Sequence, residues 1–151
     1  MKQARQSDGT NSQAIVQEQE KNERLPARFV LTVEAYLGLI RFDLCLARQD
    51  FESLYQKVRE SPTSKTPCTP CSIELICGAV DMACIWYCKE VLCLQRSAAT
   101  ACLLRKYGVP AHLVIGAQQM PFKAHAWVEV DGRVVNDKQY VPEMYGILTR
   151  C

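Results

Sequence analysis

Residues 93–110 read CLQRSAATACLLRKYGVP, and this stretch decides the fold. It contains no helix-breaking residue before Gly108, which suits a C-terminal helix cap, and Pro110 cannot continue a helix. The stretch therefore predicts a helix from Cys93 to near Tyr107. A run of small residues in its middle lets this helix lie close against a sheet.

The first residue of this helix is Cys93. The N-terminus of a helix carries the positive end of the helix dipole together with unpaired N–H groups. Both stabilise a thiolate, and the same N–H groups can hold an oxyanion. The position predicts that Cys93 is a nucleophile, with its own amide, Gln95 or Arg96 as candidate oxyanion donors.

Two short strands are expected directly after the helix, over residues 111–117 and 124–130. Both runs contain β-branched residues, and turn-forming residues separate them. Along the second strand, period-two alternation places His125, Trp127 and Glu129 on one face of the sheet. The histidine therefore follows the cysteine in the chain, on an element that can pack against its helix.

The turn at 131–132 decides whether a third strand, residues 133–137, can bring a carboxylate to His125. A two-residue loop would place Asp137 opposite Ala126, on the wrong side of the sheet. A three-residue loop with a bulge at its glycine would place Asp137 directly opposite His125. We predict the second register, because the carboxylate then fixes the imidazole tautomer, as catalytic triads require.

Four segments together resemble a known enzyme family: CLQRS at 93–97, LVIG at 113–116, FKAHAWVE at 122–129 and GRVVND at 132–137. They are similar to the leader peptidases of lasso-peptide biosynthesis, within the transglutaminase-like, papain-like superfamily of Cys-His-Asp enzymes. The resemblance covers about the last eighty residues. It implies an α+β fold: a helical N-terminal half, then the nucleophile-bearing helix packed on a small antiparallel sheet.

The resemblance also implies a function and the residues that carry it. The chain would be a cysteine peptidase that removes the leader from a ribosomally made lasso-peptide precursor through an acyl-enzyme. Cys93 would be the nucleophile, His125 the general base and Asp137 the group that orients it, with no cofactor and no metal. Trp127, on the face of His125, would either line the substrate groove or simply cover the sheet.

Partners follow from the same resemblance. The substrate would be the precursor peptide, gripped by its leader region. In this family the leader-recognition domain is either fused upstream or supplied as a separate small protein, and the upstream part of this chain looks too short to hold it. We therefore expect the separate-subunit form, which depends on a leader-recognition protein, with a lasso cyclase acting afterwards.

The residues before the catalytic core, which we place at 71–151, predict helical support. Residues 1–24 are polar, so we expect a disordered tail there. Residues 25–60 form a helical segment, because apolar residues recur at spacings of three and four. Residues 61–70 are a loop rich in Pro, Ser and Thr, and residues 71–89 form a further helix.

The composition narrows the classes of function. The chain is 48% apolar with a net charge of only +2, so we expect no nucleic-acid partner. The first 28 residues lack the apolar run of a signal peptide. Glu74 and Asp81 interrupt the longest apolar helix, so we expect no membrane span and a cytoplasmic location.

Nine cysteines cannot all pair with one another, because the number is odd. Without an export signal, we expect reduced thiols. Cys45 and Cys102 suit the core, and Cys151 suits a free tail. His112, the other histidine, suits a structural role, and Glu129 is expected to meet solvent.

Two other interpretations compete with the peptidase. A transglutaminase or other acyltransferase would use the same triad with an amine acceptor in place of water. A non-catalytic metal module would instead use the CxxC pair Cys68 and Cys71. Its remaining ligands would come from the helix cysteines Cys77, Cys84 and Cys88, although their spacing also fits one buried helix face.

Overall fold

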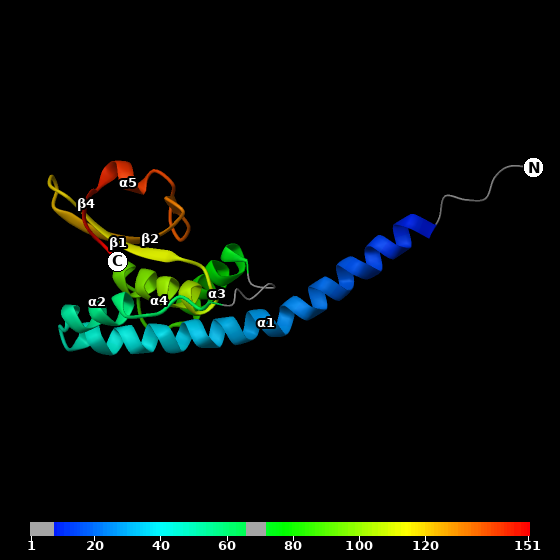
Figure 1. Cartoon of the computed structure of the whole chain (residues 1–151). Coiled ribbons are helices and arrows are strands. Elements are labelled where there is room, and N and C mark those ends of the chain that lie inside the picture. The colour runs from blue at the N-terminus through cyan, green and yellow to red at the C-terminus, as the bar shows by residue number, and fades with distance from the viewer. Residues whose placement is uncertain (1–7, 66–71) are drawn as a thin grey trace, which may run out of the picture.

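The structure is a computed structural model that describes residues 8–65 and 72–151. It has an α+β fold in which helices lie on one side of a four-stranded sheet and a short helix lies on the other (Figure 1). In chain order the elements are α1 (Asp8–Ala47), α2 (Phe51–Arg59), α3 (Ile73–Trp86), α4 (Cys93–Lys106), β1 (Ala111–Gln118), β2 (Lys123–Val130), β3 (Arg133–Val134), α5 (Val141–Met144) and β4 (Gly146–Arg150).

The sheet is antiparallel, with the strand order β3-β2-β1-β4. β1 and β2 form its centre, paired from Ala111 with Val130 to Gln118 with Lys123. These two strands match the predicted ones to within one residue at each end. Helix α4 also begins at Cys93 as predicted and ends at Lys106, one residue before Tyr107.

The predicted register of the third strand is wrong. Val130 pairs with Arg133, so the loop has two residues, Asp131 and Gly132, with φ of 49° and 74°. Both conformations are left-handed, and Asp-Gly is a favoured sequence for such a turn because its twist matches that of the strands. β3 also ends at Val134, so it is shorter than the expected strand over 133–137.

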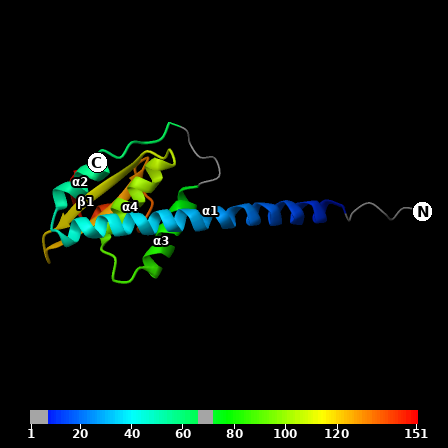
Figure 2. The ribbon, with the colours of Figure 1, turned by 90° about the horizontal axis from the view of Figure 1, so that it is seen from below.

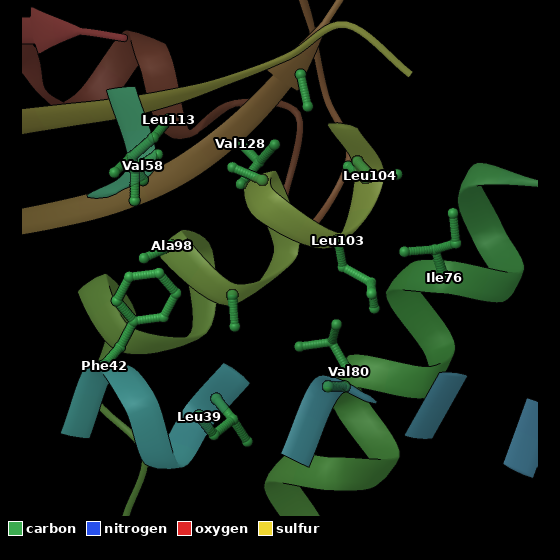
Figure 3. Packing of buried hydrophobic residues seen from close by; sticks show 14 of the residues in the cluster. Leu39, Phe42, Val58, Ile76, Val80, Ala98, Leu103, Leu104, Leu113 and Val128 are labelled. Atoms are coloured by element: carbon green, nitrogen blue, oxygen red, sulfur yellow. The ribbon is translucent and has the colours of Figure 1, made fainter. Parts of the chain in front are cut away.

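The main core lies between the sheet and the helices α1, α2, α3 and α4. Leu39 and Phe42 of α1 point upward toward α4, which in turn lies beneath the strands (Figure 3). Leu113 and Val128 close this core from the sheet. A smaller cluster on the opposite face is formed by Val114, Trp127, Val134 and Val141, so the central strands β1 and β2 bury residues on both faces of the sheet.

Helix α1 differs from the expected disordered tail, because it begins at Asp8. Residues 10–25 contain neither Gly nor Pro and are rich in Gln and Glu, which are good helix formers. A composition that cannot build a core can therefore still form a helix. This first part of α1 projects away from the rest of the chain (Figure 1), and residues 1–7 lie outside the described ranges.

Two of the helices begin at polar residues that are typical N-caps. Asp50 caps α2 by accepting a hydrogen bond from the Ser53 N–H at 2.9 Å, and Ser72 caps α3 by accepting one from the Leu75 N–H at 3.2 Å. The expected loop over 61–70 and the expected helix over 71–89 fall partly outside the described residues. Within 8–65 and 72–151, no helix is long and apolar enough to cross a membrane.

The C-terminal elements α5 and β4 have no counterpart in the sequence predictions. β4 pairs with β1, and Cys151 continues this pairing by exchanging two main-chain hydrogen bonds with Leu113, of 2.7 and 3.0 Å. The Tyr55 hydroxyl of α2 also contacts the Thr149 hydroxyl at 2.8 Å. The prediction that Cys151 is a free tail is therefore wrong.

Candidate active site

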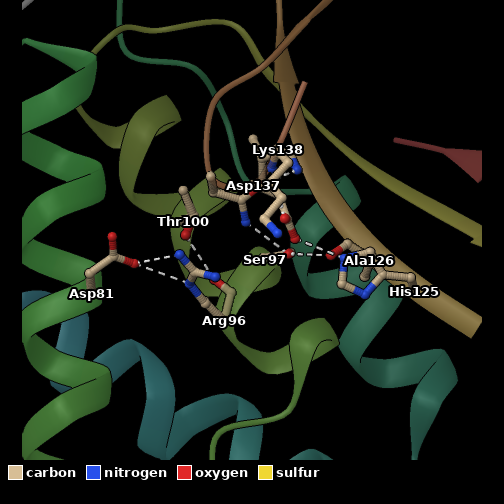
Figure 4. A network of polar contacts seen from close by, with 10 residues as sticks. Asp81, Arg96, Ser97, Thr100, His125, Ala126, Asp137 and Lys138 are labelled. Carbon is tan, nitrogen blue, oxygen red and sulfur yellow. Dashed lines mark hydrogen bonds and ion pairs between the residues drawn. The ribbon is translucent and has the colours of Figure 1, made fainter. Parts of the chain in front are cut away.

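A buried polar junction joins the first turns of α4 to β2. The Ser97 hydroxyl donates to the carbonyl of Ala126 at 2.9 Å and accepts from the Asn136 side-chain N–H at 2.9 Å (Figure 4). The Asn136 side-chain oxygen in turn accepts from the Val128 N–H at 2.7 Å. Ser97 and Asn136 are both buried, so water does not compete for these bonds.

This junction determines which residues of β2 lie beside the start of α4. The Arg105 side chain donates to the carbonyl of Ala111, so the end of α4 lies at the start of β1, and α4 therefore runs in the same direction as β2. Cys93 is one helical turn before Ser97, or about 6 Å along the axis. In a strand, about 6 Å corresponds to two residues. Cys93 therefore lies at the level of residues 124–125.

His125 is paired with a carboxylate. Its Nε2 lies 2.8 Å from Oδ2 of Asp137, and both side chains are about three-quarters buried, with 24% and 23% exposed. Burial by itself raises the pKa of Asp137. Hydrogen bonds from the Lys138 N–H and from His125, with the electrostatic attraction of His125 and Arg96, together outweigh it, so the pKa of Asp137 is lowered.

The contact between His125 and Asp137 forms even though the register prediction is wrong. The chain leaves the ladder after the Val135 N–H donates to the carbonyl of Val128 at 2.9 Å. The Asn136 side chain, and not the main chain, then continues the pairing with β2. Asp137 is thereby released from the position opposite Ala126 that a continuous strand would give it.

Aromatic rings enclose His125 on one side. The Tyr145 ring centre lies 5.3 Å from the imidazole, and the Trp127 ring centre lies 6.3 Å from it. Gly116 makes room for this arrangement, because a Cβ there would lie 2.8 Å from the Trp127 ring and 2.9 Å from the Cβ of Tyr145. The imidazole is thus held at its edge by Asp137 and at its face by Tyr145.

A family model described as "Transglutaminase-like superfamily" matches residues 36–150, which cover α2 to β4 and part of α1. The chain belongs to this superfamily. The microcin J25-processing protein McjB of Escherichia coli is 49% identical over 45 residues, which are 30% of this chain and 22% of that protein. The chain thus matches about a fifth of that relative's length. No solved structure matches the chain.

The thiol of Cys93 is half-buried and free. The N-cap residue of α4, Leu92, makes no side-chain hydrogen bond to the first N–H groups of this helix, so these groups have no side-chain cap among the described residues. Among the described residues, the thiol has no hydrogen bond, and the structure does not join it directly to His125. What it shows is a cysteine at the helix start, level with the histidine.

Two of the three candidate oxyanion donors are engaged elsewhere. Gln95 is buried and donates to the carbonyl of Leu39 at 3.0 Å. Arg96 donates from Nε and Nη2 to Oδ1 of Asp81, at 3.1 and 2.6 Å (Figure 4). Among the candidates from the sequence, this leaves the Cys93 amide at the open end of α4.

Trp127 and Glu129 are both buried, which the alternation of residues along β2 does not predict. Trp127 is fully buried, which favours the sheet-covering role over a groove wall. Glu129 is only 4% exposed, accepts from the Trp127 indole N–H at 2.8 Å and pairs with Arg150 at 2.5 Å. The expectation that Glu129 meets solvent is wrong, because β4 supplies a cation that the sequence predictions did not place there.

The other titratable candidates lie apart from this site. His112 is exposed and pairs in register with Glu129, four residues from His125, or about 13 Å along the strand. Burial raises the pKa of the Cys77 thiol to about 11, and it also raises the pKa of Cys102. Cys68 and Cys71 lie outside the described residues, which contain no group of His, Cys, Asp and Glu suited to a metal ion.

Proposed function

We propose that this chain is a cysteine peptidase that removes the leader from a lasso-peptide precursor. The observation that carries the proposal is the pairing of His125 with Asp137 at the level where α4 begins with Cys93. A nucleophile, a base and an orienting carboxylate at one point are the parts that covalent acyl transfer needs. Membership of the transglutaminase-like superfamily and the similarity to a microcin-processing protein support this choice.

The proposed mechanism begins with the histidine tautomer. Because Nε2 of His125 faces the Asp137 carboxylate, we assign its proton to that bond, which leaves Nδ1 as the acceptor for the thiol proton. The Cys93 thiolate then attacks the scissile carbonyl carbon, and the carbonyl electrons move to oxygen. The open N–H groups at the start of α4, including that of Cys93, stabilise this oxyanion.

The remaining steps return the enzyme to its starting state. The tetrahedral intermediate collapses, the C–N bond breaks, and His125 gives its proton to the leaving amine. Water, activated by the same imidazole, then hydrolyses the thioester of Cys93. No step uses a cofactor, and Asp137 remains a carboxylate throughout because its pKa is lowered.

The proposed substrate is the precursor peptide, presented through its leader by a separate leader-recognition protein. A lasso cyclase would close the ring on the released core peptide. The cysteines in the described part of the chain are free thiols, which suits a reducing compartment, and we propose the cytoplasm.

The test is a cleavage assay with the precursor peptide and the leader-recognition protein, followed by mass spectrometry. Cys93→Ala should abolish cleavage, whereas the control Cys84→Ala should leave it unchanged, because Cys84 lies on α3. A primary amine added to the assay separates hydrolysis from acyl transfer, because a transferase would attach the amine to the product. Full activity in Cys93→Ala would contradict the proposal.

A further inference from the structure

Helix α1 carries apolar side chains on two opposite sides. Leu31, Ala35, Leu39 and Phe42 are buried against the rest of the chain. On the other side lies a row that we name the α1 seam. It comprises Val30, Val33, Leu37, Ile40 and Leu44, which are 50%, 43%, 60%, 38% and 54% exposed.

The seam repeats with spacings of three, four, three and four residues. That is the a/d repeat with which two helices pack side by side, and it is narrower than the apolar face of a single surface helix. On an α-helix the seam lies about 180° from the core-facing residues, at 100° per residue. The other labelled elements lie on one side of α1, and no element of the described ranges 8–65 and 72–151 covers the other side (Figures 1 and 2).

We propose that the seam packs against the seam of a second copy of this chain, with the two α1 helices antiparallel. In this arrangement each a position meets a d position. Leu37 contacts the partner's Ile40, and Val33 contacts the partner's Leu44. The pairing is symmetric about a point between Leu37 and Ile40, as an interface between two identical surfaces requires. Since each body lies on the far side of its own α1, the two bodies do not collide.

Charges beside the seam fit the same arrangement. Glu34 and Arg41 flank Leu37 on one side, and the antiparallel register brings Glu34 next to the partner's Arg41 twice. Arg41 is exposed and has no ion pair among the described residues. Glu34 already binds Lys106 at 2.8 Å. A hollow of about 300 Å³ between α1 and α4 is lined by Glu34, Leu37, Arg41 and Lys106, and it leaves room for an incoming side chain.

The limits of the seam favour the antiparallel over the parallel arrangement. Continuing the repeat toward the N-terminus gives Pro26, Glu23 and Gln19, which are not seam residues. A parallel pair would align the projecting first parts of α1 along these positions. An antiparallel pair overlaps only over residues 30–47, where the apolar side chains lie. The proposal does not depend on the peptidase activity.

The experiment measures molar mass by sedimentation equilibrium, in the presence of a thiol reductant that excludes disulfide-linked dimers. Wild-type chain should reach twice the 17.1 kDa of one chain as its concentration rises to about 100 μM. In the Leu37→Glu dimer, the two new glutamates and the two copies of Glu34 place four negative charges near the two-fold axis. This variant should raise the dimer dissociation constant at least about tenfold. Leu148→Glu, a control at a leucine that is 67% exposed on β4, should leave the dimer intact.

A charge exchange tests the orientation. Arg41→Glu should weaken the dimer, and the double variant Glu34→Arg with Arg41→Glu should restore part of the loss, because both inter-chain pairs are re-formed with reversed sign. Far-ultraviolet circular dichroism verifies that each variant stays folded. A monomer throughout the concentration range, or a dimer that Leu148→Glu disrupts as much as Leu37→Glu, would overturn the proposal.

Discussion

At the scale of single residues, the hydrogen bonds that Asp137 accepts from the Lys138 N–H and from His125 outweigh its burial and make the stability of the fold depend on pH. The lowered pKa of Asp137 means that the folded chain holds the carboxylate more strongly than the unfolded chain does. This contribution is fully present above the ordinary pKa of 3.8 and is lost as the pH falls through the lowered value.

We predict that Asp137→Asn removes this pH dependence. Urea unfolding midpoints measured from about pH 2 to pH 7 should separate wild type from the variant above about pH 4, and the two should converge below it. Cleavage by the variant should fall by about two to four orders of magnitude, because an amide stabilises the wrong tautomer. A separation between the midpoints that stays constant down to pH 2 would contradict this role of Asp137.

Gly116 supports a second prediction at this scale. A Cβ at this position meets the Trp127 ring and the Tyr145 Cβ at under 3.0 Å, so Gly116→Ala should cost about 1–3 kcal/mol of unfolding free energy. It should also lower activity, because Tyr145 is displaced from the His125 ring.

Gly78→Ala is the matched control. Nothing lies within 4 Å of its added methyl group, and alanine in a helix should stabilise by about 0.5–1 kcal/mol. Equal unfolding free energies for wild type and Gly116→Ala would refute this account of the packing.

At the scale of elements, the junction of α4 with β2 determines how Cys93 lies relative to His125. Asn136 is its centre, because it bonds both to the Val128 N–H and to Ser97. Asn136→Ala leaves a buried N–H without a partner, and we predict a loss of about 1–3 kcal/mol of unfolding free energy, measured in urea. Gln119→Ala, at an exposed hairpin position, should change it by less than about 0.5 kcal/mol. A loss no larger than that of the control would show that the junction does not hold α4 in place.

The sequence predicted elements better than it predicted their ends and pairing. The breakers Gly108 and Pro110 fixed α4, because local chemistry alone ends a helix there. The Asp-Gly sequence after β2 is compatible with a two-residue and with a three-residue loop, and these give different registers. We chose the three-residue loop because it completes a triad, and the structure has the two-residue loop. The contact of Asp137 with His125 still forms, because the Asn136 side chain replaces its main chain in the pairing with β2 and frees the next residue from the ladder. Strand alternation does not predict such a replacement.

Tertiary contacts explain the other differences. β4 is a short strand whose residues are mostly exposed, and it is held by pairing with β1 and by the contact of Arg150 with Glu129. Strand β1 and Glu129 are both distant from β4 in the sequence, so no pattern within residues 146–151 predicts these contacts. The burial of Glu129 and the ordering of Cys151 both depend on this strand, which is why both predictions failed together.

At the scale of the whole molecule, the described core begins at Leu31, well inside α1. We predict that deletion of residues 1–24 changes the unfolding free energy by less than about 1 kcal/mol, because residues 8–24, the first part of α1, project from the body. Leu39→Ala, which empties a fully buried position, should cost about 2–5 kcal/mol in the same urea titration. A deletion as costly as Leu39→Ala would show that the first part of α1 packs on the body.

In the proposed mechanism, His125, held by Asp137, activates Cys93. The most direct test of this claim is the iodoacetamide alkylation rate of every cysteine between about pH 5 and pH 9, measured by peptide mass spectrometry for wild type and His125→Ala. Cys93 should react fastest near pH 6–7 and lose this advantage without His125, while Cys77, with its pKa raised to about 11, stays slow. A Cys93 that reacts no faster than the exposed Cys88, with Cys68 and Cys71 protected until a chelator is added, would contradict the claim and favour the metal module.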